Sequence, residues 1–192
     1  MLNIHTHKLP ADPSEPFVLN CNIGEVPVSV ERCSVGLHPW KVDAEWRDMM
    51  PVLRRDVILP NVVAIGECGL DGLRGGDMNM QVDAFCAQIQ LSEEVGKPLI
   101  IHCVRKFDLL LQLHKKYNPR QLWIVHGFRG KPELAMRLTK AGIRLSFGEK
   151  FNPESLKAVV SAGSSFYIET DEADLSLSEV QASVQKHISR QS

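Results

Sequence analysis

The chain has 192 residues, of which 44% are hydrophobic and 23% charged, and its formal net charge is −1. These values are typical of a globular domain, and we expect residues 1–192 to form a single one. The small net charge excludes a general basic field, so a polyanion would have to bind locally. No apolar run reaches the ~18–20 residues of a membrane span, and residues 1–10 lack a signal-peptide pattern, so we expect a cytoplasmic protein without membrane partners.

Eight short β-type runs, rich in Val, Ile, Leu and Phe, can be identified along the chain. Most are almost continuously apolar, which is typical of strands buried on both faces in a parallel sheet. The runs cover residues 2–6, 17–22, 33–38, 62–67, 98–102, 122–126, 143–147 and 165–169.

Helical stretches separate the later runs, and their Met, Leu and Val stripes indicate packing against a core. Pro132 stands at a first helical position, Asn152 is a predicted N-cap followed by Pro153, and Ser176 or Ser178 opens the last helix. The expected helices cover residues 43–56, 79–95, 106–116, 131–141, 153–162 and 176–189.

The alternation of strands and helices predicts an α/β fold, and eight strands indicate a (β/α)8 barrel of the TIM type. The chain is shorter than the ~250 residues usual for such a barrel. The missing length lies near the N-terminus, where about ten residues with three prolines join the first two runs and cannot hold an ordinary helix. The next connection, around residues 27–31, has room for one or two turns. We therefore expect a distorted, minimal barrel whose first helix is missing and whose second is reduced.

Candidate metal ligands stand at or just past the ends of these runs. His5 and His7 are two residues apart on a strand, so both imidazoles face the same side. Glu67 ends an apolar run, where an unpaired carboxylate would cost several kcal/mol. Each residue alone has an ordinary alternative, such as a chance histidine pair, a satisfied buried histidine or a capping carboxylate. The complete set is His5, His7, Glu67, His102, His126 and Asp171.

The set as a whole belongs to the carboxyl ends of strands 1, 4, 5, 6 and 8, which is where barrel active sites form. Four histidines and two carboxylates suit two divalent ions of the zinc, manganese or magnesium type. Two such ions can clamp the attacking and leaving oxygens of a displacement. The sequence therefore predicts a metal-dependent hydrolase.

The five cysteines form no CxxC pair, so they indicate neither a zinc ribbon nor a redox motif. Their odd number and apolar surroundings indicate reduced, mostly buried thiols of an intracellular protein. Cys68 and Cys103 each follow a candidate ligand directly. Because neighbours on a strand point to opposite faces, we do not expect either thiol to bind the metal.

Six segments resemble the TatD family of metal-dependent hydrolases, one of the amidohydrolase-like barrels. The resemblance extends from about residue 3 to residue 171 and implies hydrolysis of phosphodiester bonds by a metal-activated water, as in a deoxyribonuclease or exonuclease. The implied substrate is DNA or a small phosphodiester. The segments are HTH at 5–7, GLHPW at 36–40, AIGECGLD at 64–71, PLIIH at 98–102, VHGFRG at 125–130 and ETD at 169–171.

The resemblance also implies roles for single residues. One divalent ion would be held by His5, His7 and Asp171, the second by His102 and His126, and Glu67 would bridge the two.

Four further roles concern catalysis and substrate binding. Asp171 would orient the attacking water or accept its proton. His38 would contact the phosphate or the leaving oxygen. The alternative is that His38, directly before Pro39, is only the residue at which a helix begins. Arg105 and Arg129 lie in loops of the same face and would bind phosphate, unless they are solvated surface residues.

Some positions depart from the family pattern. Asn3 stands where the family has Asp, and EADLS follows Asp171 in place of the usual Pro-containing segment. Two alternatives therefore remain: a related barrel hydrolase of amide or ester bonds, and a reduced paralogue without catalysis. Those other barrels often carry a modified lysine on the fourth strand, so Glu67 favours the TatD branch. The sequence leaves the oligomeric state, the metal identity and the physiological substrate open.

Overall fold

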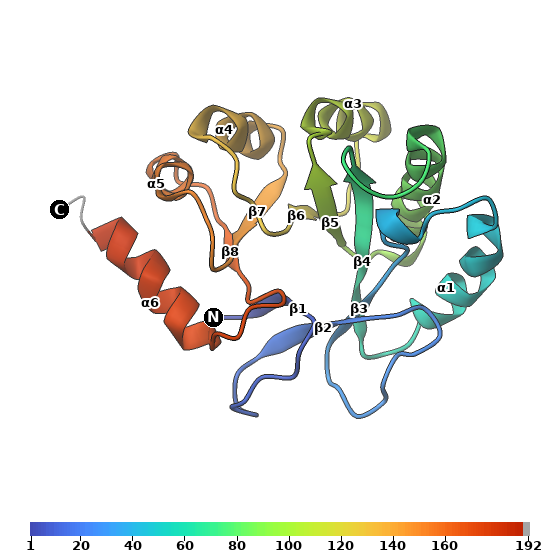
Figure 1. Cartoon of the computed structure of the whole chain (residues 1–192), viewed down its shortest axis with the longest axis horizontal. Helices are drawn as coiled ribbons and strands as arrows, with labels where there is room; N and C mark the ends of the chain where they lie inside the picture. Colours follow the sequence, from blue (N-terminus) through green and yellow to red (C-terminus); the bar gives the residue numbers. More distant parts are fainter. Residues whose placement is uncertain (190–192) are drawn as a thin grey trace. The chain divides into compact units, whose positions relative to one another are not determined.

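A computed structural model of the chain describes residues 1–189 (Figure 1). All eight expected strands are present, in the order β1 to β8 around a closed barrel, which confirms the TIM-type fold. The pairs β1–β2, β1–β8, β3–β4, β4–β5 and β7–β8 are parallel. The strands are β1 (Asn3–Thr6), β2 (Phe17–Cys21), β3 (Cys33–Val35), β4 (Val62–Asp71), β5 (Leu99–Val104), β6 (Trp123–Val125), β7 (Arg144–Phe147) and β8 (Tyr167–Ile168).

Helices follow β3 and every later strand, and within residues 1–189 no helix joins β1 to β2 or β2 to β3. The absence of the first helix is therefore as predicted. The second connection, for which the sequence predicts a reduced helix, contains only turns, at residues 23–24 and 28–29. The stretch expected as one helix over residues 43–56 is instead a 3-10 helix followed by an α-helix. The helices are η1 (Pro39–Lys41), η2 (Trp46–Met49), α1 (Met50–Asp56), α2 (Met78–Val95), α3 (Phe107–Tyr117), α4 (Pro132–Lys140), α5 (Pro153–Ser161) and α6 (Leu177–Ile188).

Three predicted helix starts are confirmed. Pro132 is the first residue of α4, where its missing N–H leaves no intrahelical bond unmade. The Asn152 side chain caps α5 by accepting hydrogen bonds from the first-turn amides of Glu154 and Ser155. Ser176, one of the two serines considered, caps α6 in a capping box with Glu179.

The chain divides into two compact units, which are described separately. The terminal unit comprises residues 1–19 and the described chain from Val125 onward, and the central unit comprises residues 20–124. In the terminal unit, α4 packs on β7, α6 packs on β8, and α5 contacts both α4 and α6. In the central unit, α2 packs against β4 and α3 against β5, as Figure 1 shows.

Strand β4 is longer than the sequence predicts. The prediction ends this strand at Glu67, but the ladder with β5 continues to the pair Asp71–Val104. The reason is that Gly66 and Gly69 interrupt the apolar run without ending the strand. Cys68 and Leu70, beyond Glu67, are still fully buried. Glu67 therefore lies in the middle of β4, and Asp71 occupies its end.

Gly69 permits a close approach of β4 and β5. It pairs with His102 in the ladder, and a Cβ atom at this position would overlap the His102 carbonyl oxygen. Its φ of +133° also disfavours any side chain. A glycine here thus sets the spacing between the two strands that carry Glu67 and His102.

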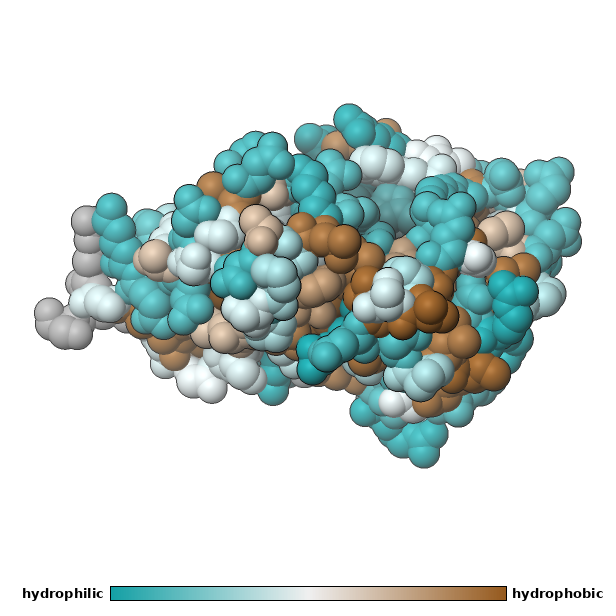
Figure 2. Space-filling view, turned by 90° about the horizontal axis from the view of Figure 1, so that it is seen from below, coloured by the Kyte–Doolittle hydropathy of each residue, from teal (hydrophilic) through white to brown (hydrophobic). Residues whose placement is uncertain are grey.

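None of the helices described over residues 1–189 is both long and apolar enough to cross a membrane. On the face drawn in Figure 2, hydrophobic residues form separate patches between hydrophilic ones.

Candidate functional site

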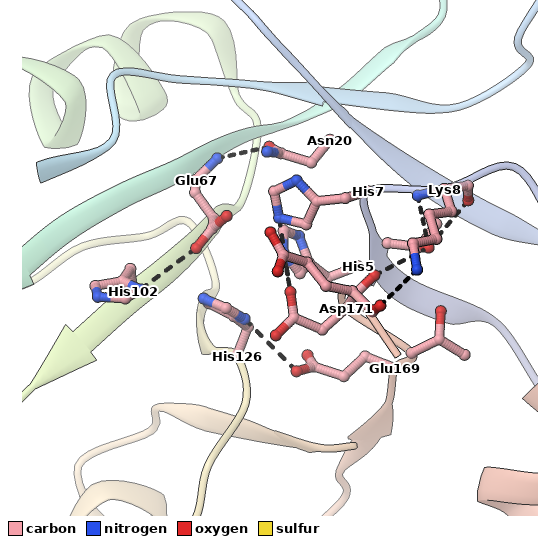
Figure 3. Close-up of polar contacts among 12 residues, drawn as sticks. His5, His7, Lys8, Asn20, Glu67, His102, His126, Glu169 and Asp171 are labelled. Carbon is pink, nitrogen blue, oxygen red and sulfur yellow. Dashed lines mark hydrogen bonds and ion pairs between the residues drawn. The ribbon is translucent and has the colours of Figure 1, made fainter. Parts of the chain in front are cut away.

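His5, His7 and Asp171 form one cluster in the terminal unit (Figure 3). Nε2 of His5 and Nε2 of His7 each lie 3.6 Å from Oδ1 of Asp171. His5 is fully buried in β1, whereas the side chains of His7 and Asp171 are each 32% exposed. The cluster therefore has a buried side and a side open to solvent, as a site for an ion and a substrate needs.

Backbone hydrogen bonds hold Asp171 beside β1. The Asp171 amide donates to the His5 carbonyl at 3.1 Å, and the His7 amide donates to the Asp171 carbonyl at 3.1 Å. Asp171 thereby forms a parallel bridge with Thr6 and adopts a left-handed φ of +52°. This short ladder beyond β8 turns the carboxylate toward the two imidazoles.

Glu169 is a site residue that the sequence prediction missed. It directly follows β8, is fully buried, and its Oε1 lies 3.5 Å from Nδ1 of His126. Ser146 of β7 donates a hydrogen bond to its other oxygen. His126, Glu169 and Asp171 form a second possible ligand group of the terminal unit. The signal that could have found Glu169 is its position two residues before Asp171, in the same spacing as His5 and His7.

The central unit carries a further cluster, His38, Glu67 and His102 (Figure 3 labels the last two). Nε2 of His38 and Nδ1 of His102 each lie 3.4 Å from Oε1 of Glu67. Glu67 is buried, and its backbone amide donates to Asn20 at 2.9 Å. A buried carboxylate thus faces two imidazoles from neighbouring strands.

The register of β4 and β5 explains the orientation of His102. Glu67, Gly69 and Asp71 face the same side of β4, and His102 pairs with Gly69 between them. The ring consequently reaches Glu67 with Nδ1 and Asp71 with Nε2, the latter at 3.0 Å. Asp71, which the sequence prediction also missed, accepts a hydrogen bond from Nε2–H, which leaves the lone pair of Nδ1 available to a metal.

Four hydrogen bonds keep Asp71 ionised. Burial by itself raises the pKa of this carboxyl, but hydrogen bonds from Trp40, His102 and the amides of Leu73 and Arg74 outweigh it and lower the pKa to about 2. Asp71 is therefore a permanent acceptor for His102 at neutral pH.

His38 differs from His102 in the state of its ring. It is the N-cap of η1, and its Nδ1 accepts the amide of Trp40 at 3.2 Å. In the neutral ring the proton is then on Nε2, the atom 3.4 Å from Glu67. His38 is thus arranged to donate a hydrogen bond rather than to bind a metal through Nε2.

The separations within the clusters fit metal coordination. A charge-assisted N–H···O hydrogen bond is about 2.7–2.9 Å long. Two ligands about 2.1 Å from a tetrahedral zinc ion stand roughly 3.4 Å apart. The nitrogen–oxygen distances of 3.4 to 3.6 Å match the second value. Glu169 Oε1, buried and accepting no hydrogen bond from the described residues, is the kind of atom that a cation stabilises.

The two arginines predicted to bind phosphate lie in the loops that follow β5 and β6, and both are exposed. Arg129 lines a cavity of about 250 Å³ together with Lys150, Glu169 and Asp171. The cavity joins two cationic side chains to the carboxylates of the terminal unit. Arg105 directly follows β5 with a left-handed φ of +54°.

The thiols next to the ligands do not belong to the clusters. Cys68 is fully buried, and its Sγ lies 3.7 Å from the Ile100 carbonyl oxygen. Burial raises the pKa of Cys68, and it raises that of Cys103 to about 12. Since a metal binds the thiolate, neither sulfur is a suitable ligand.

The fold and these clusters define a TIM-type barrel with histidine and carboxylate groups in its strands and directly after them. The chain belongs to the TatD related DNase family, whose model matches residues 26–187.

Similar proteins agree with this assignment. The chain is 36% identical over 105 residues to the "3'-5' ssDNA/RNA exonuclease TatD" of Erwinia tasmaniensis and 42% identical over 100 residues to that of Pantoea vagans. These matches cover 53% and 50% of this chain but only 40% and 38% of the relatives, so the chain matches less than half of their length.

Two solved structures are also similar. YJJV, a TatD homolog from Escherichia coli, matches with a TM-score of 0.61 at 26% identity. The match covers 69% of this chain and 56% of the YJJV chain. A TatD family hydrolase from Entamoeba histolytica matches with a TM-score of 0.67 at 16% identity, over 88% of this chain and 73% of that one. At this identity the match supports the fold alone.

Proposed function

We propose that this chain is a metal-dependent phosphodiesterase that shortens single-stranded nucleic acid from the 3′ end. Two groups of side chains carry the proposal: His5, His7 and Asp171 in the terminal unit, and Glu67 and His102 in the central unit. The nitrogen–oxygen separations within each group match those of metal ligands. Family membership supports the reaction type, and the names of the relatives support the direction and the single-stranded substrate.

Two divalent ions of the zinc, manganese or magnesium type are part of this proposal. His5, His7 and Asp171 are the proposed ligands of one ion, and Glu67 and His102 are proposed ligands of the other. His126, which the family resemblance assigns to the second ion, lies beside Glu169 in the terminal unit. Imidazole nitrogens favour zinc and its transition-metal neighbours. Such ions supply Lewis acidity and a water of lowered pKa.

The side chains of the protein hold and move the protons. Asp171 is the proposed acceptor of the proton from the attacking water, because its carboxylate is partly open to solvent. His38, with its proton on Nε2, is the proposed donor to a phosphate or leaving oxygen. Asp71 holds the His102 ring by its hydrogen bond with Nε2, so that Nδ1 points toward Glu67 and is available to a metal.

Arg129 and Arg105 are the proposed binding residues for the substrate phosphate. Arg129 and Lys150 line the cavity that also contains Asp171, and Arg105 is exposed at the end of β5. Local cations of this kind are needed because the net charge of the whole chain is −1. A cytoplasmic location is also proposed, since none of the five cysteines, all of which lie within residues 1–189, forms a disulfide.

The proposal is tested by substrate choice. Purified protein is assayed with bis-(p-nitrophenyl) phosphate, single-stranded DNA and p-nitrophenyl acetate in Mn²⁺, Mg²⁺ or Zn²⁺, each with and without EDTA. We expect EDTA-sensitive turnover of the two phosphodiesters. Turnover of the ester alone would instead indicate an amide or ester hydrolase, and absence of both turnover and bound metal would indicate a non-catalytic paralogue.

A further inference from the structure

Trp40 is the exposed member of the three tryptophans, all of which lie in the described part of the chain. It is 48% exposed, whereas Trp46 and Trp123 are 4% and 1% exposed. A single exposed apolar side chain is ordinary by itself. Trp40 is different because its surroundings fix the orientation of the ring.

Three contacts hold the indole of Trp40. Its Nε1 donates a hydrogen bond to Oδ2 of Asp71 at 2.7 Å. The ring of His38 stands edge-on to it, with centroids 4.8 Å apart. The guanidinium of Arg74 lies 5.0 Å from the ring centroid on one face. These contacts produce a partly exposed aromatic surface of fixed orientation, with a cation beside it.

This surface adjoins the cluster proposed to act on the phosphodiester. The carboxylate oxygen of Asp71 that accepts from Trp40 also accepts from Nε2 of His102. The rings of Trp40 and His102 are 5.7 Å apart, in a T-shaped arrangement. One carboxylate thus fixes both the indole and a proposed metal ligand, which gives the ring a defined position relative to the reacting group.

We propose that Trp40 and Arg74 form a stacking site for a nucleobase of single-stranded nucleic acid. This inference rests on the proposed function and names a subsite of the same active site. A base stacks on the open part of the indole, and Arg74 adds a cation–π contact and a positive charge for the adjoining phosphate. Because every base has a π face, the site accepts any sequence. It would supply local affinity to a chain without a basic field.

The experiment measures binding without cleavage. Full-length protein in EDTA is titrated with a short oligodeoxythymidylate and with an abasic backbone of the same length, and its tryptophan fluorescence is recorded. The other two tryptophans are buried, so quenching reports on Trp40. We expect the oligonucleotide that carries bases to quench the emission and to bind ~5- to 100-fold more tightly than the abasic one.

Variants separate stacking from a structural role, with affinity measured by the anisotropy of an end-labelled oligonucleotide. Trp40→Ala should abolish the preference for bases, whereas Trp40→Phe, which loses the bond to Asp71 but keeps an aromatic face, should retain part of it. Arg74→Ala should weaken binding. The matched control is Arg47→Ala, because Arg47 also lies over a tryptophan, at 4.5 Å, but that residue is the buried Trp46.

The outcomes distinguish this inference from the proposed function. Equal affinity for the two oligonucleotides, no binding of either, or a base preference that survives Trp40→Ala overturns the stacking site. Turnover of bis-(p-nitrophenyl) phosphate in Mn²⁺ by the same preparations tests phosphodiesterase activity independently. A base preference without that turnover would support the stacking site while contradicting the proposed activity.

Discussion

His102 donates a hydrogen bond from Nε2 to Asp71 at 3.0 Å and turns Nδ1 toward Oε1 of Glu67, 3.4 Å away. Both carboxylates lie on the same face of β4, on either side of Gly69. The strand register therefore determines which nitrogen of His102 carries the proton and which is available to a metal. Carboxylate–histidine pairs of this kind orient metal ligands and raise their basicity.

Replacing Asp71 by Asn should weaken metal binding in the central unit. The amide lacks the charge that holds the Nε2 proton, so His102 loses its fixed ring state, and we expect a ~10- to 100-fold lower affinity for Zn²⁺. Competition with a fluorescent chelator measures this change. Asp83→Asn is the control, since Asp83 is exposed and pairs only with Arg47 among the contacts described. An unchanged affinity in Asp71→Asn would remove the assigned role of Asp71.

Replacing Asp171 by Asn should reduce turnover of a phosphodiester by ~10²- to 10⁴-fold, because the proposed proton acceptor is lost. The secondary structure should persist, since the backbone bonds of residue 171 to His5 and His7 do not involve the side chain. The matched control is Asp174→Asn, which removes an exposed carboxylate paired with Lys8. Steady-state rates of the two variants are compared, and equal rates would contradict the role of Asp171.

Divalent metal should stabilise the folded chain. An ion at about 100 times its dissociation constant contributes ~2.7 kcal/mol to the free energy of unfolding. For a chain of this size that is a rise in Tm of roughly 5–11 °C. Calorimetry in Mn²⁺ or Zn²⁺ against EDTA measures the rise, which Glu67→Gln should reduce. A Tm that is indifferent to every metal would show that the clusters do not bind ions.

Asn3 should matter for stability through Thr170. Its Nδ2 donates to the Thr170 hydroxyl at 2.8 Å, and its Oδ1 accepts the Thr170 amide at 3.1 Å. Asn3→Ala leaves that buried amide unsatisfied and should lower the free energy of unfolding by ~1–3 kcal/mol. Asn3→Asp keeps an acceptor and should cost less. Urea titrations of both variants test this order, and an equal loss would refute it.

His114 should make the protein less stable in mild acid. Burial lowers the pKa of this imidazole below 6.5, and its ring stands edge-on to Trp123 with centroids 4.9 Å apart. Below pH 6.5 the imidazole of His114 binds a proton in the unfolded chain but stays neutral in the folded chain. The free energy of unfolding therefore falls as the pH drops toward the lower pKa of the folded state. Urea unfolding at pH 7.5 and 5.5 should show a smaller difference for His114→Gln than for the unchanged chain. Equal differences would contradict this assignment.

The fold could be predicted because each buried strand is a short apolar run, and the helices begin at caps and prolines that act locally. The candidate ligands His5, His7, His102 and His126 could be proposed from strand position, because parallel strands place their ends on one face. Asp71 could not be predicted in this way, because the glycines of β4 hide the length of that strand.

Glu169 and Trp40 were missed for other reasons. Glu169 ends an apolar run and stands two residues before Asp171, so the sequence carried a signal for it, but only the structure shows its contact with His126. The exposure of Trp40 depends on the packing of Pro39 and on the bond to Asp71, which lies 31 positions further along the chain. Long-range contacts of this kind leave no periodic signal in the sequence.

The most direct test of the central claim is the digestion of a 5′-labelled single-stranded oligonucleotide by the purified chain in Mn²⁺. We predict a ladder of products that shortens progressively from the 3′ end and that disappears when EDTA is added or when Asp171 is replaced by Asn. An oligonucleotide that stays intact in Mn²⁺, Mg²⁺ and Zn²⁺, with protein that contains bound metal, would contradict the account.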